Sequence, residues 1–213
     1  MRRGSVRLCS VVFGGLLAVV APVMADPVDN PGIARFSNDT GPYPFLKLPN
    51  GEWLSTGAGP MDPQQAFLAQ VDSAGNLTFL SASIPYLPSV ELIGAVPVEV
   101  QLVIEDITGT VNFASGDSIA WMVTARLAFQ TSSVSGDTCR TDTFTFELVG
   151  ELTGGANKDF FVPVLTGSGT GACNGYAAEI NADFNLGTYS AGEILIDKWS
   201  AINALTLAPL IGS

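Results

Sequence analysis

The chain has 213 residues, with 20 acidic and nine basic side chains and no histidine, which gives a formal net charge of −11. Nucleic-acid binding is not expected, because contacts to phosphates need clustered lysine and arginine side chains. The lack of histidine excludes Ser-His-Asp and Cys-His catalytic arrangements, together with the common histidine-based zinc sites.

The first 25 residues have the pattern of an export signal. Arg2, Arg3 and Arg7 precede an apolar run over Val11–Val20, and the small residues up to Ala25 predict cleavage after that position. The run is too short to span a bilayer as an anchor helix, so no membrane span is expected. We therefore expect the protein to be secreted into the periplasm or the extracellular space. Without the three signal arginines, six basic residues face 20 acidic ones, a net charge of −14.

Residues 26–42 are predicted to form an extended N-terminal lead-in, and residues 43–213 a single domain. The lead-in starts with D-P-V-D-N-P-G, which contains two prolines and no apolar period. After it, apolar residues recur mostly at every second position, which is typical of β-strands. The clearest case is Ile119–Thr131, where every odd-numbered residue from Ile119 to Phe129 is apolar.

The same alternation predicts several other strands. They cover Phe45–Leu48, Trp53–Thr56, Val98–Ile104, Phe144–Leu148, Phe160–Thr166 and Tyr176–Leu186. Asn50-Gly51 predicts a hairpin between the first two. Ala66–Val71 fits either a helix or the first arm of a hairpin that turns at Asp72–Asn76, and the strand is slightly favoured. Three prolines make Ile84–Pro97 a crossover loop or an edge strand, because proline cannot donate to a central ladder.

These strands and turns predict an all-β fold. We expect a single antiparallel β-sandwich of jelly-roll or immunoglobulin-like type, with a small β-barrel as the alternative. Trp121, Phe129, Phe144, Phe146 and Phe184 are the predicted large core residues. The apolar segment after Asn203 is either a final strand of this sheet or a strand donated to another subunit.

Two cysteines remain after the signal, because Cys9 lies within it. An even pair in an exported chain predicts a disulfide between Cys139 and Cys173. A redox pair is less favoured, because the two cysteines lack the C-x-x-C spacing.

No cofactor is expected, although calcium is the one ion that the composition leaves open, because it binds carboxylate and carbonyl oxygens without histidine. The candidate ligands lie in predicted turns and are Asp72, Asn76, Asp137 and Asp142. The competing explanation is that Asp and Asn side chains in tight turns bind their own backbone.

Four aromatic residues in or near predicted loops are candidates for stacking on a sugar or another ligand. They are Trp53, beside the Asn50-Gly51 hairpin, and Tyr43, Tyr86 and Tyr176. Such residues combine a large apolar face with a polar group.

Three classes of function follow from these features. The leading expectation is a secreted, non-catalytic structural or interaction protein of the cell envelope or extracellular space, which self-associates or binds an extracellular protein or glycan. The second is an extracellular carbohydrate- or ligand-binding module. The third is a secreted hydrolase, which would need two carboxylates facing each other across a cleft.

Overall fold

The computed structural model describes residues 31–38, 44–55, 66–84, 86–112, 118–151, 160–166, 172–190 and 199–203. Most of these residues lie in strands, with one α-helix among them, which confirms the all-β prediction. The predicted export signal, Tyr43 and the segment after Asn203 lie outside the described residues.

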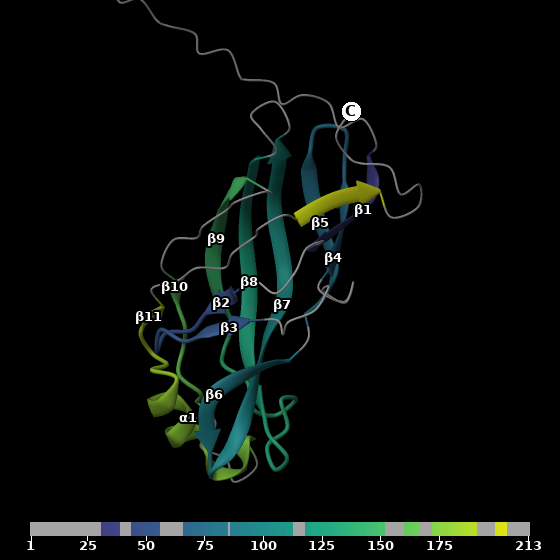
Figure 1. Ribbon diagram of the computed structural model, residues 1–213. Helices are drawn as coiled ribbons and strands as arrows, with labels where there is room; N and C mark the ends of the chain where they lie inside the picture. Colours follow the sequence, from purple (N-terminus) through teal and green to yellow (C-terminus); the bar gives the residue numbers. More distant parts are fainter. Residues whose placement is uncertain are drawn as a thin grey trace, which may run out of the picture.

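Seven strands form one antiparallel sheet in the order β12–β1–β4–β5–β7–β8–β9 (Figure 1). Their bounds are Trp199–Asn203 (β12), Gly32–Asn38 (β1), Ala66–Val71 (β4), Asn76–Ser83 (β5), Val96–Asn112 (β7), Ser118–Gln130 (β8) and Phe144–Glu151 (β9). An eighth strand, β6 (Leu87–Ile93), pairs with β7 off this path. The strands that the structure describes do not close into a barrel, so the barrel alternative is wrong.

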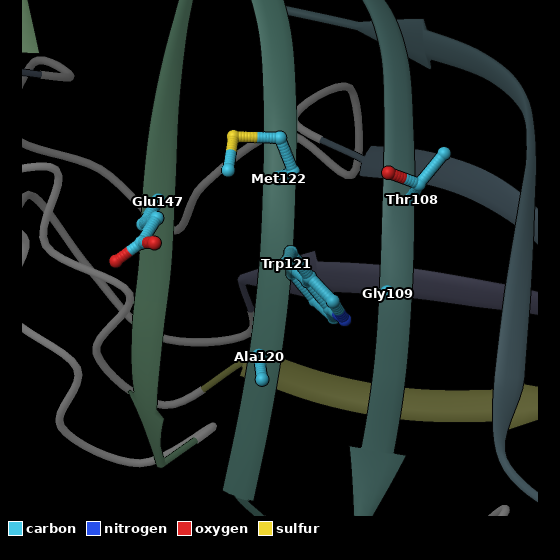
Figure 2. A pocket seen from close by; sticks show the side chains of 6 residues that line it. All are labelled: Thr108, Gly109, Ala120, Trp121, Met122 and Glu147. Carbon is cyan, nitrogen blue, oxygen red and sulfur yellow. The ribbon is translucent and has the colours of Figure 1, made fainter.

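The large sheet coils so far that its two halves face each other. Phe36 on β1 and Trp121 on β8 are separated by four strand-to-strand steps, which would be about 19 Å in a flat sheet. Their ring centroids nevertheless lie 5.4 Å apart, edge to face. Figures 1 and 2 show β12 and β1 crossing β7 and β8 at a steep angle, as in an orthogonal sandwich. The predicted sandwich is therefore confirmed.

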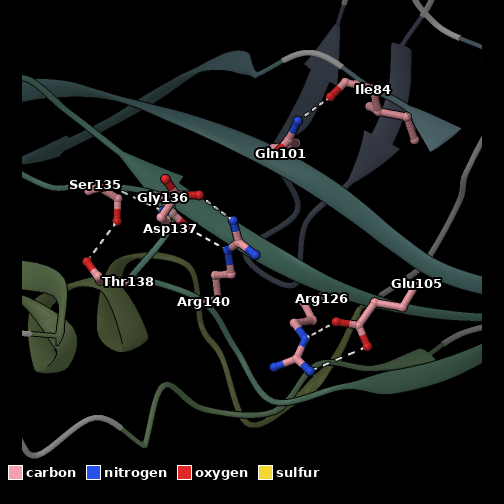
Figure 3. A network of polar contacts seen from close by, with 9 residues as sticks. All are labelled: Ile84, Gln101, Glu105, Arg126, Ser135, Gly136, Asp137, Thr138 and Arg140. Atoms are coloured by element: carbon pink, nitrogen blue, oxygen red, sulfur yellow. Dashed lines mark hydrogen bonds and ion pairs between the residues drawn. The ribbon is translucent and has the colours of Figure 1, made fainter. Parts of the chain in front are cut away.

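The alternation predicted for Ile119–Thr131 is confirmed in β8. The odd-numbered side chains from Trp121 to Phe129 are buried, whereas Met122 on the opposite face is 42% exposed. Ala128, also on that opposite face, is the exception and is buried. On β7 the buried positions change from even to odd along the strand. Ile104 pairs with Ala125 but Asp106 pairs with Thr124, so Glu105 is an extra residue in a β-bulge. Glu105 forms an ion pair with Arg126 (Figure 3).

Two sequence predictions are wrong, each for an identifiable reason. β1 lies inside the range predicted as a lead-in, and it is hydrogen-bonded to β12 and β4. Among the β1 side chains whose burial the structure describes, Ala34 and Phe36 are the buried ones, too few to show a period after the prolines. The predicted strand Tyr176–Leu186 is instead helix α1 (Ala177–Asp183) followed by a turn. Ile180 and Phe184 fit a helix equally well, because residues four apart share a helical face.

The other predicted elements are mostly confirmed. Ala66–Val71 is a strand, and Ile84–Pro97 contains the edge strand β6, which pairs only with β7 among the described strands. The segment Phe160–Thr166 is strand only at β10 (Phe160–Phe161), which pairs with β11 (Tyr189–Ser190). The Asn50-Gly51 hairpin joins β2 (Pro44–Lys47) and β3 (Trp53–Ser55).

The β2–β3 hairpin, β10–β11 and α1 add buried side chains to the core of the large sheet. Leu48 and Leu54 belong to the same buried cluster as Trp121. Phe184 packs on Phe129 with centroids 5.0 Å apart. At the hairpin turn, Gly51 has a left-handed φ of +88°.

Polar contacts fix the hairpin in place. Asn50 donates through Nδ2 to the Asp183 carbonyl (3.1 Å) and to Glu91 Oε1 (3.3 Å). The Glu52 carboxylate accepts a 2.8 Å bond from Ser89 Oγ and a further bond from the Val90 N–H. The hairpin is therefore tied to both β6 and the end of α1.

The predicted disulfide joins Cys139 and Cys173, whose Cα atoms are 4.5 Å apart. Cys139 lies in the loop between β8 and β9, and Cys173 lies in the 3₁₀ helix Ala172–Gly175 that precedes α1. Both cysteines are buried. The bond therefore links the large sheet to the segment that carries α1.

Replacing both Cys139 and Cys173 by alanine should lower the free energy of unfolding by about 3–4 kcal/mol, because the bond closes a loop of 34 residues in the unfolded chain. Urea unfolding of the variant measures this loss. Wild-type protein under reducing conditions should match the variant. Titration that recovers both thiols from the native protein would contradict the bond.

Gly109→Ala should be among the most destabilising glycine substitutions. Gly109 on β7 pairs with Trp121 and has a φ of +141°, and an added Cβ would lie 2.1 Å from the Ala120 carbonyl oxygen. We expect a loss of about 2–4 kcal/mol, from backbone strain plus displacement of β8. Gly51→Ala is the matched control, because nothing lies within 4 Å of its added Cβ; its strain alone should cost about 1–2 kcal/mol. Equal losses in urea unfolding would refute the close approach at Gly109.

Candidate functional site

A hollow of about 300 Å³ lies on the outer face of the sheet across β7, β8 and β9 (Figure 2). It is lined by Thr108, Gly109, Ala120, Trp121, Met122 and Glu147. Met122 pairs with Thr108 on one side and with Glu147 on the other, so these three exposed side chains form a row across three strands. The lining supplies a hydroxyl, a thioether and a single carboxylate. It therefore offers polar contacts to a ligand but lacks the carboxylate pair that a glycosidase requires.

Trp53, the leading candidate for ligand stacking, is half-buried beside its cross-strand partner Lys47. The Lys47 ammonium nitrogen lies 5.5 Å from the centre of the Trp53 ring, within the range of a cation–π contact. The Trp53 ring therefore already contacts Lys47, a residue of the same chain.

Tyr86 and Tyr176 are also half-buried, and each hydroxyl lies close to a glycine. A Cβ at Gly136 would lie 1.8 Å from the Tyr86 oxygen, and one at Gly94 would lie 3.0 Å from the Tyr176 oxygen. Burial raises the pKa of the Tyr86 phenol, an effect opposed by the positive charge of Arg140. The two hydroxyls thus fill space left by glycine, and Tyr176 also packs against the core.

Asp72 and Asn76 are in contact, but in the manner of a turn. Asp72 Oδ1 accepts hydrogen bonds from the backbone N–H groups of Ala74 and Asn76, both at 2.9 Å. Its Oδ2 accepts one from Asn76 Nδ2 at 2.8 Å. The bond from the Asn76 side chain, followed by those from the backbone, lowers the pKa of Asp72 below its usual value. The Asn76 side chain thus turns its amide N–H toward the Asp72 carboxylate. To bind a cation together with Asp72, it would have to present its amide oxygen instead.

Asp137 is likewise engaged by a neighbour (Figure 3). Arg140 donates through Nη2 to Asp137 Oδ1 and through Nε to the Gly136 carbonyl, both at 2.7 Å. Asp142 is exposed. Across the described ranges, no three His, Cys, Asp or Glu side chains converge where a metal ion could bind.

An exposed apolar ridge on the β6–β7 hairpin was not singled out by the sequence. We define it as Pro88, Val90, Leu92 and Pro97, all of them exposed, with Val90 at 79% and Leu92 at 49%. The ladder between β6 and β7 is irregular between Pro88 and Leu92. Within this stretch the polar residues Ser89 and Glu91 are half-buried, and both contact the β2–β3 hairpin. The apolar side chains between and beside them are left facing solvent.

A second exposed group, which we call the aromatic notch, consists of Phe161, Val164 and Tyr189. Their side chains are 43%, 41% and 69% exposed. One signal was present in the sequence: neighbouring residues of a strand face opposite sides, so one member of Phe160-Phe161 had to point outward. Tyr189 carried no comparable signal, because its position depends on the pairing of β10 with β11.

No protein-family model matches the chain, and comparisons with curated proteins and with solved structures also return no match. Within the described ranges, no helix combines the length and the apolar character needed to cross a membrane.

The Asp72 turn gives a pH-dependent prediction. A carboxyl whose pKa is lowered by folding stabilises the native state above its unfolded pKa, and this contribution is lost as the pH falls through the folded pKa. Asp72→Asn should therefore be less stable than wild type at neutral pH, and the difference should shrink by about pH 2. Chemical unfolding at both pH values measures it, with Asp106→Asn on β7 as the control.

The same variant tests calcium. If Asp72 and Asn76 serve only the turn, adding calcium or a chelator should leave the thermal midpoint of wild type unchanged. A rise in the midpoint with calcium, absent in Asp72→Asn, would instead make these residues metal ligands.

Proposed function

We propose that this chain is an exported, non-catalytic structural or interaction protein, and that it binds another protein in the cell envelope or extracellular space through the apolar ridge. The proposal rests mainly on the exposure of Val90 and Leu92. Burying an apolar side chain of this size contributes roughly 1.5–3 kcal/mol, so leaving two neighbours exposed favours a surface that a partner covers.

The surroundings of the ridge favour contact by side chains over strand addition. Glu52 accepts the Val90 N–H, so this backbone donor of β6 is already bonded within the chain. An incoming strand would have to displace that carboxylate. The ridge side chains do not take part in that bond. They extend outward from the β6–β7 hairpin, which is hydrogen-bonded to Asn50 and Glu52 of the β2–β3 hairpin.

The two alternative functions have weaker support at their predicted residues. A binding module that stacks ligands on Trp53, Tyr86 or Tyr176 would have to use half-buried side chains with existing contacts. A hydrolase would need facing carboxylates. The hydrogen-bonded carboxylates of Glu52, Glu91, Glu99, Glu105 and Asp137 each meet a donor from a neighbouring strand or turn.

The experiment compares wild type with Val90→Ser/Leu92→Ser in producing cells. Native electrophoresis and chemical cross-linking of the exported fraction should place wild type in a complex larger than the monomer and the double variant in monomeric form. Leu80→Ser is the matched control, because Leu80 is 50% exposed on β5, outside the ridge. Surface changes of this kind should alter stability by less than about 0.5 kcal/mol each.

A wild-type protein that is cytoplasmic, or monomeric wherever it is found, would overturn the proposed function. Loss of the complex in Leu80→Ser as well as in the double variant would overturn the role of the ridge. If the purified mature chain forms the complex alone, the partner is a second copy.

A further inference from the structure

The aromatic notch exposes two rings to solvent, and their planes are inclined to each other. Phe161 on β10 and Tyr189 on β11 are paired across the small sheet, with ring centroids 5.6 Å apart and planes at 66°. Their exposed fractions are 43% and 69%. Val164 extends the apolar surface near the turn before β11, where a Cβ on Gly187 would lie 2.7 Å from Val164 Cγ1. Two non-parallel rings form a corner rather than a flat patch.

Ring packing and backbone hydrogen bonds fix the strands that carry the notch. Phe160, the neighbour of Phe161, is buried and stacks on Phe144 at 5.5 Å with an interplanar angle of 2°. The backbone beside it is held by bonds from Val162 N to the Thr188 carbonyl and from Gly187 N to the Val162 carbonyl. A ligand therefore meets rings whose backbone is already fixed, which reduces the entropy lost on binding.

The size of the notch argues for a small ligand unit. A large aromatic side chain offers about 150–250 Å² in total, so the exposed parts of these two rings amount to roughly 200 Å². A stable protein interface buries about 800 Å² on each partner, several times more. One sugar ring has an apolar C–H face that can lie on one aromatic ring while its edge contacts the other.

The charge of the protein narrows the class of sugar. The mature chain has six basic against 20 acidic side chains, so it repels polymers of uronic acids and sulfated glycans. A neutral glycan meets no such repulsion. The hydroxyl of Tyr189 can bond to the polar rim of a sugar, because a phenol both donates and accepts.

We propose that Phe161 and Tyr189 form a stacking site for one hexose unit of a neutral extracellular glycan. The site lies on different elements from the apolar ridge, and the inference does not depend on the proposed protein partner. The stacking site is on the β10–β11 sheet, whereas Trp53 is on the β2–β3 sheet.

The test uses the purified mature chain, residues 26–213, and isothermal titration calorimetry. The probes are soluble hexamers of β-1,4-glucose, β-1,4-mannose and β-1,4-N-acetylglucosamine, soluble starch, and oligogalacturonate as the anionic comparison. At least one neutral probe should bind, and oligogalacturonate should not. Tyr189→Ala and Phe161→Ala should each weaken binding by about tenfold, the loss expected for removing one stacked ring.

Conservative variants separate stacking from general apolarity. Tyr189→Phe keeps the ring and should retain binding within a few-fold, whereas Tyr189→Leu keeps the apolar character and should lose it. Leu80→Ser, an exposed apolar position on β5 outside both the ridge and the notch, should bind like wild type. Circular dichroism and thermal melting confirm that each variant is folded.

The proposal is overturned by any of three results. One is that no neutral probe binds; another is that only oligogalacturonate binds; the third is that Tyr189→Leu binds as well as wild type. None of these outcomes bears on the complex expected at the ridge, so the two proposals fail independently.

Discussion

The contact between Phe36 and Trp121 is the constraint on which the rest of the fold depends. It joins two strands that are four places apart in one sheet, and both side chains are almost fully buried. A single sheet with one apolar face would leave that face in water, so it must either pack on a second sheet or coil onto itself. This chain does the latter. Gly109 permits a close approach of β7 to β8 directly beside Trp121.

The coiling of the sheet also determines which surfaces of the protein are exposed and available for binding. The inner face is closed by β1 at one end and by the β2–β3 hairpin, β10–β11 and α1 further along the strands (Figure 1). The outer face of β7, β8 and β9 carries the exposed row of Thr108, Met122 and Glu147. The notch lies on β10 and β11, which help to close the core. The ridge lies on β6 and the start of β7, in the large sheet, where Asn50 and Glu52 of the β2–β3 hairpin bind β6.

Some elements can be predicted from the sequence because the interactions that form them are local. Asn50-Gly51 and Asp72–Asn76 turn where expected, since glycine and aspartate act on their own backbone within a few residues. The long alternation in β8 identifies its buried face without any knowledge of its neighbours. α1 was missed because seven residues carry too few apolar positions to distinguish a period of 3.6 from a period of two. The predictions of stacking and calcium residues rest on residue type, and type alone does not show that Lys47 lies over Trp53 or that Asn76 donates to Asp72.

The sequence by itself determined the all-β class, the main strands, the hairpins and the pairing of Cys139 with Cys173, because alternation, turn chemistry and cysteine number are properties of short segments. Only the tertiary structure decided that β1 belongs to the sheet, that the sheet coils onto itself, and that Val90, Leu92, Phe161 and Tyr189 face outward. The physical reason is that solvent exposure is set by what packs against a residue. Bulges, register and the docking of distant elements control that packing, and the local pattern of apolar residues predicts none of them.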